Sequence, residues 1–221
     1  MDGSHSAGFA WKDLQAAIEA LAAHFAKAPV ALGDTRETRA STPALLIPYV
    51  DSHTLGEPTR WVLTPPELRG QSAAERRRDF DARHGAWRAS IIDAPRGEES
   101  VVGVLVLAPK AATSLAQLIF FNNVGSLPMC VHGTIGIVRT LAAYCGLPPG
   151  EYRFETPAGD ITARHEGSDA VEVDNVASYR VSREHRVQTE SHGEVVGDVV
   201  WGGNTFFFMR DLNNRIAPEE F

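Results

Sequence analysis

Apolar positions recur at helical spacing near the start of the chain and form short runs after residue 44. Leu14, Ile18, Leu21 and Phe25 share one helical face in an Ala-rich stretch that ends before Pro29, which predicts an amphipathic helix. The later runs are bounded by turn residues and predict strands. The predicted strands are residues 45–50, 60–63, 87–92, 101–108, 118–122, 152–155, 160–165, 170–173, 195–201 and 205–209.

A central helix separates the two groups of predicted strands. Met129–Tyr144 has the pattern of this helix, which Cys145-Gly146 closes. Strands, one helix and strands again indicate an α/β (α+β) fold with a mostly antiparallel sheet. We expect three parts. Residues 1–43 form an extension whose helix docks or is dispensable, 44–154 a first half with the central helix, and 155–221 a partial second half.

Composition and charge narrow the function classes. The 221 residues are 43% hydrophobic and 22% charged, which is typical of a globular protein. The net charge of −7 argues against a nucleic-acid partner. The densest basic cluster lies in a helix-like stretch, residues 66–83, with interleaved acids, and this favours a solvated face with internal ion pairs. No apolar run approaches the ~18 residues of a membrane span, and the N-terminus lacks a secretory-signal pattern.

The two cysteines, Cys130 and Cys145, are too few for a disulfide framework and lack metal-ligand spacing. A reduced, cytoplasmic protein without a metal is the simplest expectation. A buried, inert thiol is the ordinary role of a free cysteine. From spacing alone, a buried Cys130 beside a capping His132 remains the alternative to a functional site.

The position of Cys130 favours chemistry, because a strand and a turn precede it and a helix follows. The first N–H groups of a helix lack internal acceptors, and the macrodipole favours negative charge there. We therefore expect a lowered thiol pKa at Cys130, which His132 tunes further. The same N–H groups are expected to hold a substrate carboxylate, with Gly133 permitting its approach.

Seven collinear segments between residues 44 and 221 resemble the proline racemase family. Met129–Gly133 resembles the family motif Met-Cys-Gly-His-Gly, and Asp51–Arg60 resembles its first signature. The other similar segments are residues 95–97, 120–125, 155–159, 174–180 and 201–204. The residues of Asn122–Gly125 and Trp201–Asn204 resemble those of the hydroxyproline epimerase branch.

The resemblance implies two pseudo-symmetric halves, as in diaminopimelate epimerase, each a curved sheet around a central helix. It implies a cofactor-independent isomerase acting on a small molecule, 4-hydroxyproline or proline. One thiol removes the Cα proton, and a second returns a proton to the opposite face. Cys130 is then catalytic, and Val131, His132 and Gly133 bind the substrate carboxylate. No nucleic acid or membrane takes part, and a homodimer is among the assemblies implied.

Four departures from the family pattern keep alternatives open. The second motif, Asp-Arg-Ser-Pro-Cys-Gly-Thr-Gly, is expected beyond Phe221, and Cys145 cannot replace it because it lies about 22 Å along the helix from Cys130. Val131 and Leu55 stand where the family has glycine. Epimerases often carry His-Gly where this chain has Leu212-Asn213. We expect the chain by itself to be inactive and prone to associate.

Two functions therefore remain as alternatives to the epimerase. One is a trans-3-hydroxy-L-proline dehydratase, a lyase in which Thr replaces the second Cys. The other is a non-catalytic family fragment that binds proline-like carboxylates. Asp51, His53 and Glu57 suit either acid/base chemistry or a polar turn near the site, and the turn is the simpler interpretation. Gly202–Asn204 is expected to be a bend that lines the cleft between the halves.

Overall fold

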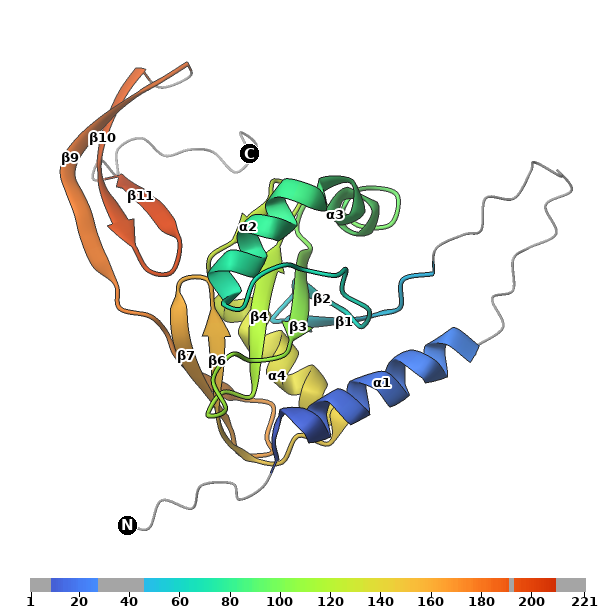
Figure 1. Cartoon of the computed structure of the whole chain (residues 1–221). Coiled ribbons are helices and arrows are strands. Elements are labelled where there is room, and N and C mark those ends of the chain that lie inside the picture. Colours follow the sequence, from blue (N-terminus) through green and yellow to red (C-terminus); the bar gives the residue numbers. More distant parts are fainter. Residues whose placement is uncertain (1–8, 28–45, 191–192, 210–221) are drawn as a thin grey trace, which may run out of the picture. The chain divides into compact units, whose positions relative to one another are not determined.

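The computed structural model describes residues 9–27, 46–190 and 193–209. The chain divides into two compact units, residues 1–174 and 175–221, and Figure 1 traces their elements. Parts of the expected extension, residues 1–8 and 28–43, and the Leu212-Asn213 position lie outside the described residues. The division into three parts at residues 43 and 154 stays a prediction.

Unit 1 is built on a mostly antiparallel sheet, which has eight strands in the described part of the chain. The strands are β1 Tyr49–Thr54, β2 Glu57–Val62, β3 Val102–Leu107, β4 Ala116–Phe121, β5 Ser126–Leu127, β6 Gly150–Thr156, β7 Gly159–His165 and β8 Val171–Asp174. Their order is β1-β2-β3-β4-β6-β7-β8, with β5 beside β4. Only the β2–β3 and β4–β6 pairs are parallel, because helical crossovers join those strands.

Helices cover both faces of this sheet. The described helices are α1 Trp11–Lys27, α2 Ala73–Arg83, α3 Gly85–Ile92 and α4 Val131–Cys145. On one face, Phe121 of β4 packs against Phe80 and Trp87 from α2 and α3. On the opposite face, Phe120 lies against Gly133 of α4. Every residue of β4 is buried, as expected for a strand covered on both sides.

The strand predicted at residues 87–92 is wrong, because these residues form helix α3. A short apolar run does not distinguish a buried strand from a buried helix. Here Trp87 and Ile91 lie one helical turn apart, and both pack with Phe80 in one core cluster. The helix-like stretch at 66–83 begins only at Ala73, where Ser72 and Glu75 form a capping box.

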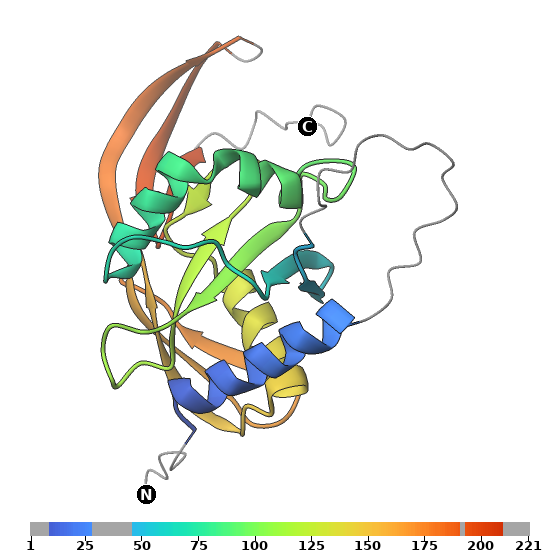
Figure 2. The ribbon, with the colours of Figure 1, turned by 45° about the vertical axis from the view of Figure 1, so that its right-hand side comes forward.

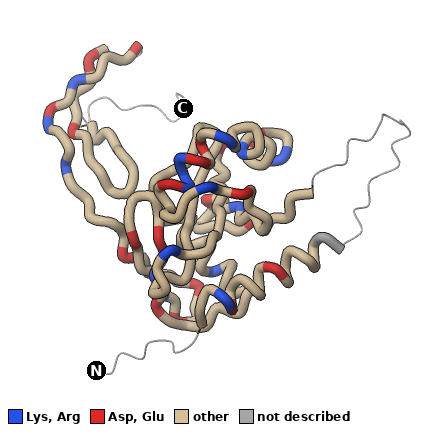
Figure 3. The backbone as a smooth tube through the Cα atoms, viewed as in Figure 1, with Lys and Arg blue, Asp and Glu red and all other residues tan. Residues whose placement is uncertain are grey.

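The basic cluster on α2 forms the expected ion pairs, and charges of both signs interleave there (Figure 3). It is not wholly a solvated face. Arg76 donates to the Ala108 carbonyl at 2.7 Å, and Arg77 donates to Ser126 Oγ at 2.7 Å. These two arginines therefore connect α2 to the residue that follows β3 and to β5.

The other predicted helices are confirmed. α1 contains the stripe from Leu14 to Phe25, and α4 ends at Gly146, whose φ of 68° makes it a left-handed cap. None of the helices in the described ranges is long and apolar enough to cross a membrane.

Unit 2 contains a three-stranded antiparallel sheet in its described residues, in the order β11-β10-β9. The strands are β9 Tyr179–Thr189, β10 Gly193–Trp201 and β11 Thr205–Met209. β9 has no counterpart among the predicted strands, because its mostly polar and exposed residues show no sustained apolar alternation. Every residue of β11 is exposed, including Phe206, Phe207 and Phe208.

Candidate active site

Cys130 is the N-cap residue of α4. Its backbone is extended, with φ −146° and ψ 115°, and the helix begins at Val131. The first helical hydrogen bond runs from the Thr134 N–H to the Cys130 carbonyl at 3.0 Å. The N–H groups of Val131, His132 and Gly133 therefore precede the hydrogen-bonded part of the helix. The structure confirms the expected placement of Cys130 at a helix start.

The expected lowering of the Cys130 pKa is wrong in its net direction. Burial raises the pKa of the Cys130 thiol above its ordinary value of 9.0, and the nearby Glu57 carboxylate raises it further. The backbone N–H groups of Gly133 and His132 oppose both effects, because they favour the thiolate. The two N–H groups together lower the pKa by less than burial and Glu57 raise it.

His132 contacts the candidate thiol directly. Its Nδ1 lies 3.4 Å from Cys130 Sγ, and its backbone carbonyl accepts a hydrogen bond from Thr54 Oγ1 at 3.1 Å. Its Nε2 is buried and has no hydrogen-bond partner among the described residues. The side chain is thus held beside the sulfur and retains one free ring nitrogen.

Gly133 and Val131 have different surroundings. A Cβ on Gly133 would lie 2.9 Å from the Phe120 ring and 3.4 Å from Cys130 Sγ, so glycine is required for packing at this position. Gly133 is buried, and its backbone faces the sulfur and the sheet. Val131 is exposed at 40% in the first helical turn.

The β1–β2 hairpin carries the Asp51–Arg60 signature and packs against the start of α4. Besides the Thr54 contact, Thr59 and Ser52 leave no room for a Cβ at Gly136, which would lie 2.8 Å from Thr59 Oγ1. The segment expected to be a turn is mostly paired strand, with its turn confined to Leu55 and Gly56. Its expected place near Cys130 is confirmed by these contacts.

Arg60 holds the base of this hairpin. Its guanidinium donates to both carboxylate oxygens of Asp51 at 2.8 Å, so Asp51 is occupied structurally. The same group donates to the carbonyls of Ile91 and Arg96 at 2.7 and 2.6 Å. Gly97 is needed in that turn, because its Cβ would overlap the Ile92 carbonyl. The Pro95–Gly97 segment is therefore attached to the hairpin through the bond from Arg60 to the Arg96 carbonyl.

The Glu155–Gly159 segment contacts the chain just before Cys130. The N–H of Ala158 donates to the Pro128 carbonyl at 3.1 Å, two residues before the cysteine. Burial tends to raise the pKa of Glu155, but hydrogen bonds from the N–H groups of Ala111 and Lys110 outweigh it and lower the pKa. The β1–β2 hairpin and the Glu155–Gly159 segment, which are distant in sequence, thus both contact the region around the start of α4.

The Gly202–Asn204 segment forms the expected bend, which joins β10 to β11, and Gly203 has φ 95°. It belongs to unit 2. Its expected role in lining a cleft stays a prediction.

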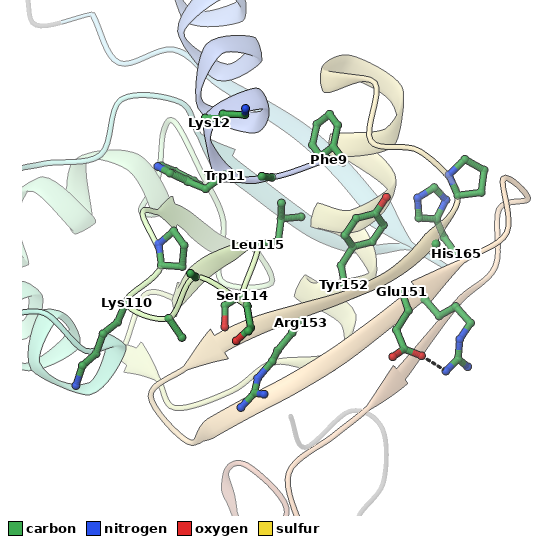
Figure 4. Close-up of a pocket in the computed structure, with 18 of the residues that line it drawn as sticks. Phe9, Trp11, Lys12, Lys110, Ser114, Leu115, Glu151, Tyr152, Arg153 and His165 are labelled. Atoms are coloured by element: carbon green, nitrogen blue, oxygen red, sulfur yellow. Dashed lines mark hydrogen bonds and ion pairs between the residues drawn. The ribbon is translucent and has the colours of Figure 1, made fainter. Parts of the chain in front are cut away.

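A hollow in unit 1 lies away from Cys130. It has a volume of about 1120 Å³ and lies among the start of α1, the loop before β4, the start of β6 and the end of β7 (Figure 4). Trp11, Leu115 and Tyr152 are among its lining residues, and Cys130–Gly133 are not. Cys145 is buried, and desolvation raises its pKa to about 11, as expected for an inert thiol.

Known proteins are similar to this chain in sequence. The family model described as proline racemase matches residues 49–220. The 4-hydroxyproline epimerase of Burkholderia pseudomallei is 46% identical over 174 residues, which are 78% of this chain and 56% of that protein. The 4-hydroxyproline 2-epimerase of Pseudomonas aeruginosa is also 46% identical, over 78% of this chain and 55% of its own length. The chain therefore belongs to the proline racemase family, and it spans about half the length of these curated relatives.

Solved structures show the same fold. A hydroxyproline epimerase from Agrobacterium vitis, with bound trans-4-hydroxy-L-proline, superimposes with a TM-score of 0.70 at 22% identity, covering 78% of this chain and 54% of that one. A probable proline racemase from Agrobacterium radiobacter, with bound carbonate, gives 0.65 at 21% identity over 73% and 51%. The α+β fold with a curled, mostly antiparallel sheet is thus that of the family.

Proposed function

We propose that this chain supplies one proton-transferring half of a 4-hydroxyproline 2-epimerase. The observation that carries the proposal is Cys130 at the N-cap of α4, beside the N–H groups of the first helical turn. The names of the relatives at 46% identity support the substrate. The reaction uses thiols alone and no cofactor.

The chemistry follows from the helix start. The N–H groups of Val131 and His132 hold the substrate carboxylate, where the macrodipole stabilises added negative charge. The Cys130 thiolate takes the Cα proton, and the electron pair of the broken C–H bond delocalises into the carboxylate. The thiol can return a proton to the same face. Inversion needs a second acid on the opposite face, and Cys145 is too distant for that role.

The proposal also includes an expected location and an expected assembly. The free state of Cys130 and Cys145 supports a cytoplasmic, reducing location. The exposed apolar side chains of β11 support self-association, with a homodimer as the simplest form.

A non-catalytic role has one observation in its favour. The raised pKa of Cys130 lowers the fraction of thiolate at neutral pH, which disfavours proton removal. A chain of this kind would still bind a proline-like carboxylate at the N–H groups. The dehydratase alternative shares this half of the site and differs in the second acid.

Hydrogen–deuterium exchange at the substrate Cα tests the proposal. The 221-residue protein is incubated with trans-4-hydroxy-L-proline in D₂O at pH 9, and the Cα–H signal is followed by NMR. Exchange that is lost in Cys130→Ala and kept in Cys145→Ala supports Cys130 as the base. Equal exchange in both variants would contradict the assignment of Cys130 as the base. Binding without exchange in the unaltered protein would favour the non-catalytic role.

A further inference from the structure

Helix α4 is surrounded by other elements of unit 1. It contacts both edge strands of the sheet, β1 and β8, as well as β2, β3 and β7, so the sheet curls around it. The buried positions of α4 are Gly133, Thr134, Gly136, Ile137, Val138, Thr140, Leu141 and Cys145. One further element packs closely on α4 in the described part of the chain, and this is α1 (Figures 1 and 2).

The face that α1 presents is apolar, and the rest of the helix is polar or small. Leu14 is completely buried and Ile18 is 8% exposed, one helical turn apart. Ala16, Glu19 and Ala20 are exposed. Because its buried side chains fall on one stripe, α1 is docked through a specific face.

α1 also lies outside the part of the chain that the family model matches, which begins at residue 49. Strands β1 to β8 and helix α4 lie within the matched residues. We propose that the side of α4 that α1 contacts is a docking surface for an amphipathic helix, and that α1 of the same chain is its occupant. α1 is thus an intramolecular cover for the helix that carries Cys130.

The connection between α1 and β1 favours the same chain over a second copy. Residues 28–45 join the helix to the rest of unit 1. A tether of this length gives effective concentrations in the millimolar range, well above a protein concentration of ~10 μM. Intramolecular docking therefore outcompetes the α1 of another molecule.

Paired variants of the full chain test the cover. Leu14→Asp and Ile18→Asp place a charge on the docked face, and the matched controls Ala16→Asp and Ala20→Asp place it on the exposed face. We expect the first pair to lower Tm by about 10 °C and to bind a hydrophobic dye, because each loses a buried apolar contact and buries a charge. The controls should shift Tm by no more than about 2 °C. Equal shifts in both pairs, or none in either, would overturn the proposal.

A peptide of residues 9–27 distinguishes docking from a general loss of stability. Added in excess to the Ile18→Asp protein, it should occupy the vacated face and restore part of the lost Tm, while a peptide with Asp at both apolar positions should not. No recovery with the unaltered peptide contradicts a docking surface. A Tm of the unaltered protein that rises with protein concentration, and no longer does so in Leu14→Asp, would place α1 on a second copy and overturn the intramolecular assignment.

Discussion

Opposing effects act on the ionisation of the Cys130 thiol. Desolvation and Glu57 favour the neutral thiol, while the N–H groups of Gly133 and His132 favour the thiolate. Because the pKa is raised, the thiolate fraction of Cys130 at neutral pH is smaller than that of an ordinary cysteine, so its action as a base should increase as the pH rises. A substrate carboxylate at the same N–H groups would add further negative charge beside the sulfur.

The pH dependence of alkylation measures this balance. Iodoacetamide reacts with the thiolate, so the modification rate at Cys130 should rise about tenfold per pH unit at neutral pH and reach its midpoint above pH 9.0, because the raised pKa moves ionisation to higher pH. Mass spectrometry of the Cys145→Ala protein isolates this thiol. A midpoint below pH 8 would mean that the helix N-terminus dominates after all.

Leu55 is strained by the hairpin turn that it occupies. Its φ is 50°, in the left-handed region, and its side chain is fully exposed, so no contact offsets the cost. We predict that Leu55→Gly raises the free energy of unfolding by about 1 kcal/mol, measured with urea. Leu55→Ala keeps a Cβ at the same φ and should change stability by less than about 0.5 kcal/mol. Destabilisation by glycine would show that the turn is relaxed with leucine.

The start of α4 depends on close packing between helix and sheet. Gly133→Ala would press a methyl group against Phe120 and Cys130, and Phe120 is fully buried. We expect a loss of about 1–2 kcal/mol in the free energy of unfolding, after the better helix propensity of alanine is counted. Gly125→Ala is the control, because its added methyl meets open space. Equal stability of the two variants would contradict the packing at Gly133.

Elements with strong internal signals could be predicted from the sequence. α4 has a turn before it, a glycine cap after it and an apolar period of helical length, and β4 is buried on both faces. α3 could not be separated from a strand, because eight residues with apolar ends fit either period. β9 was missed, because ion pairs such as Arg180–Asp198 replace apolar alternation on an exposed strand.

Only those features of the candidate site that depend on neighbouring residues could be predicted from the sequence. Cys130 at a helix start follows from local spacing, whereas the bond from Thr54 to the His132 carbonyl joins residues 78 positions apart. That contact depends on the sheet order, in which β1 reaches α4 only because the sheet curls. The net direction of the thiol pKa also depends on burial and on Glu57, which no local pattern reveals.

At the scale of the whole chain, the described site belongs to unit 1 alone. Unit 1 presents one thiol at one helix N-terminus, and the other cysteine of the sequence lies at the far end of the same helix. The chain spans about half the length of the epimerases that it matches. A single thiol reaches one face of a substrate Cα, so this protein should distinguish the two faces.

Comparison of the two epimers tests this account most directly. Trans-4-hydroxy-L-proline and cis-4-hydroxy-D-proline are each incubated with the 221-residue protein in D₂O, and loss of the Cα–H signal and formation of the other epimer are followed together. We predict Cys130-dependent exchange in one epimer, at a rate that rises towards pH 9, with no interconversion. Comparable exchange in both epimers, or conversion of one to the other, would contradict a site with a single thiol on a single face.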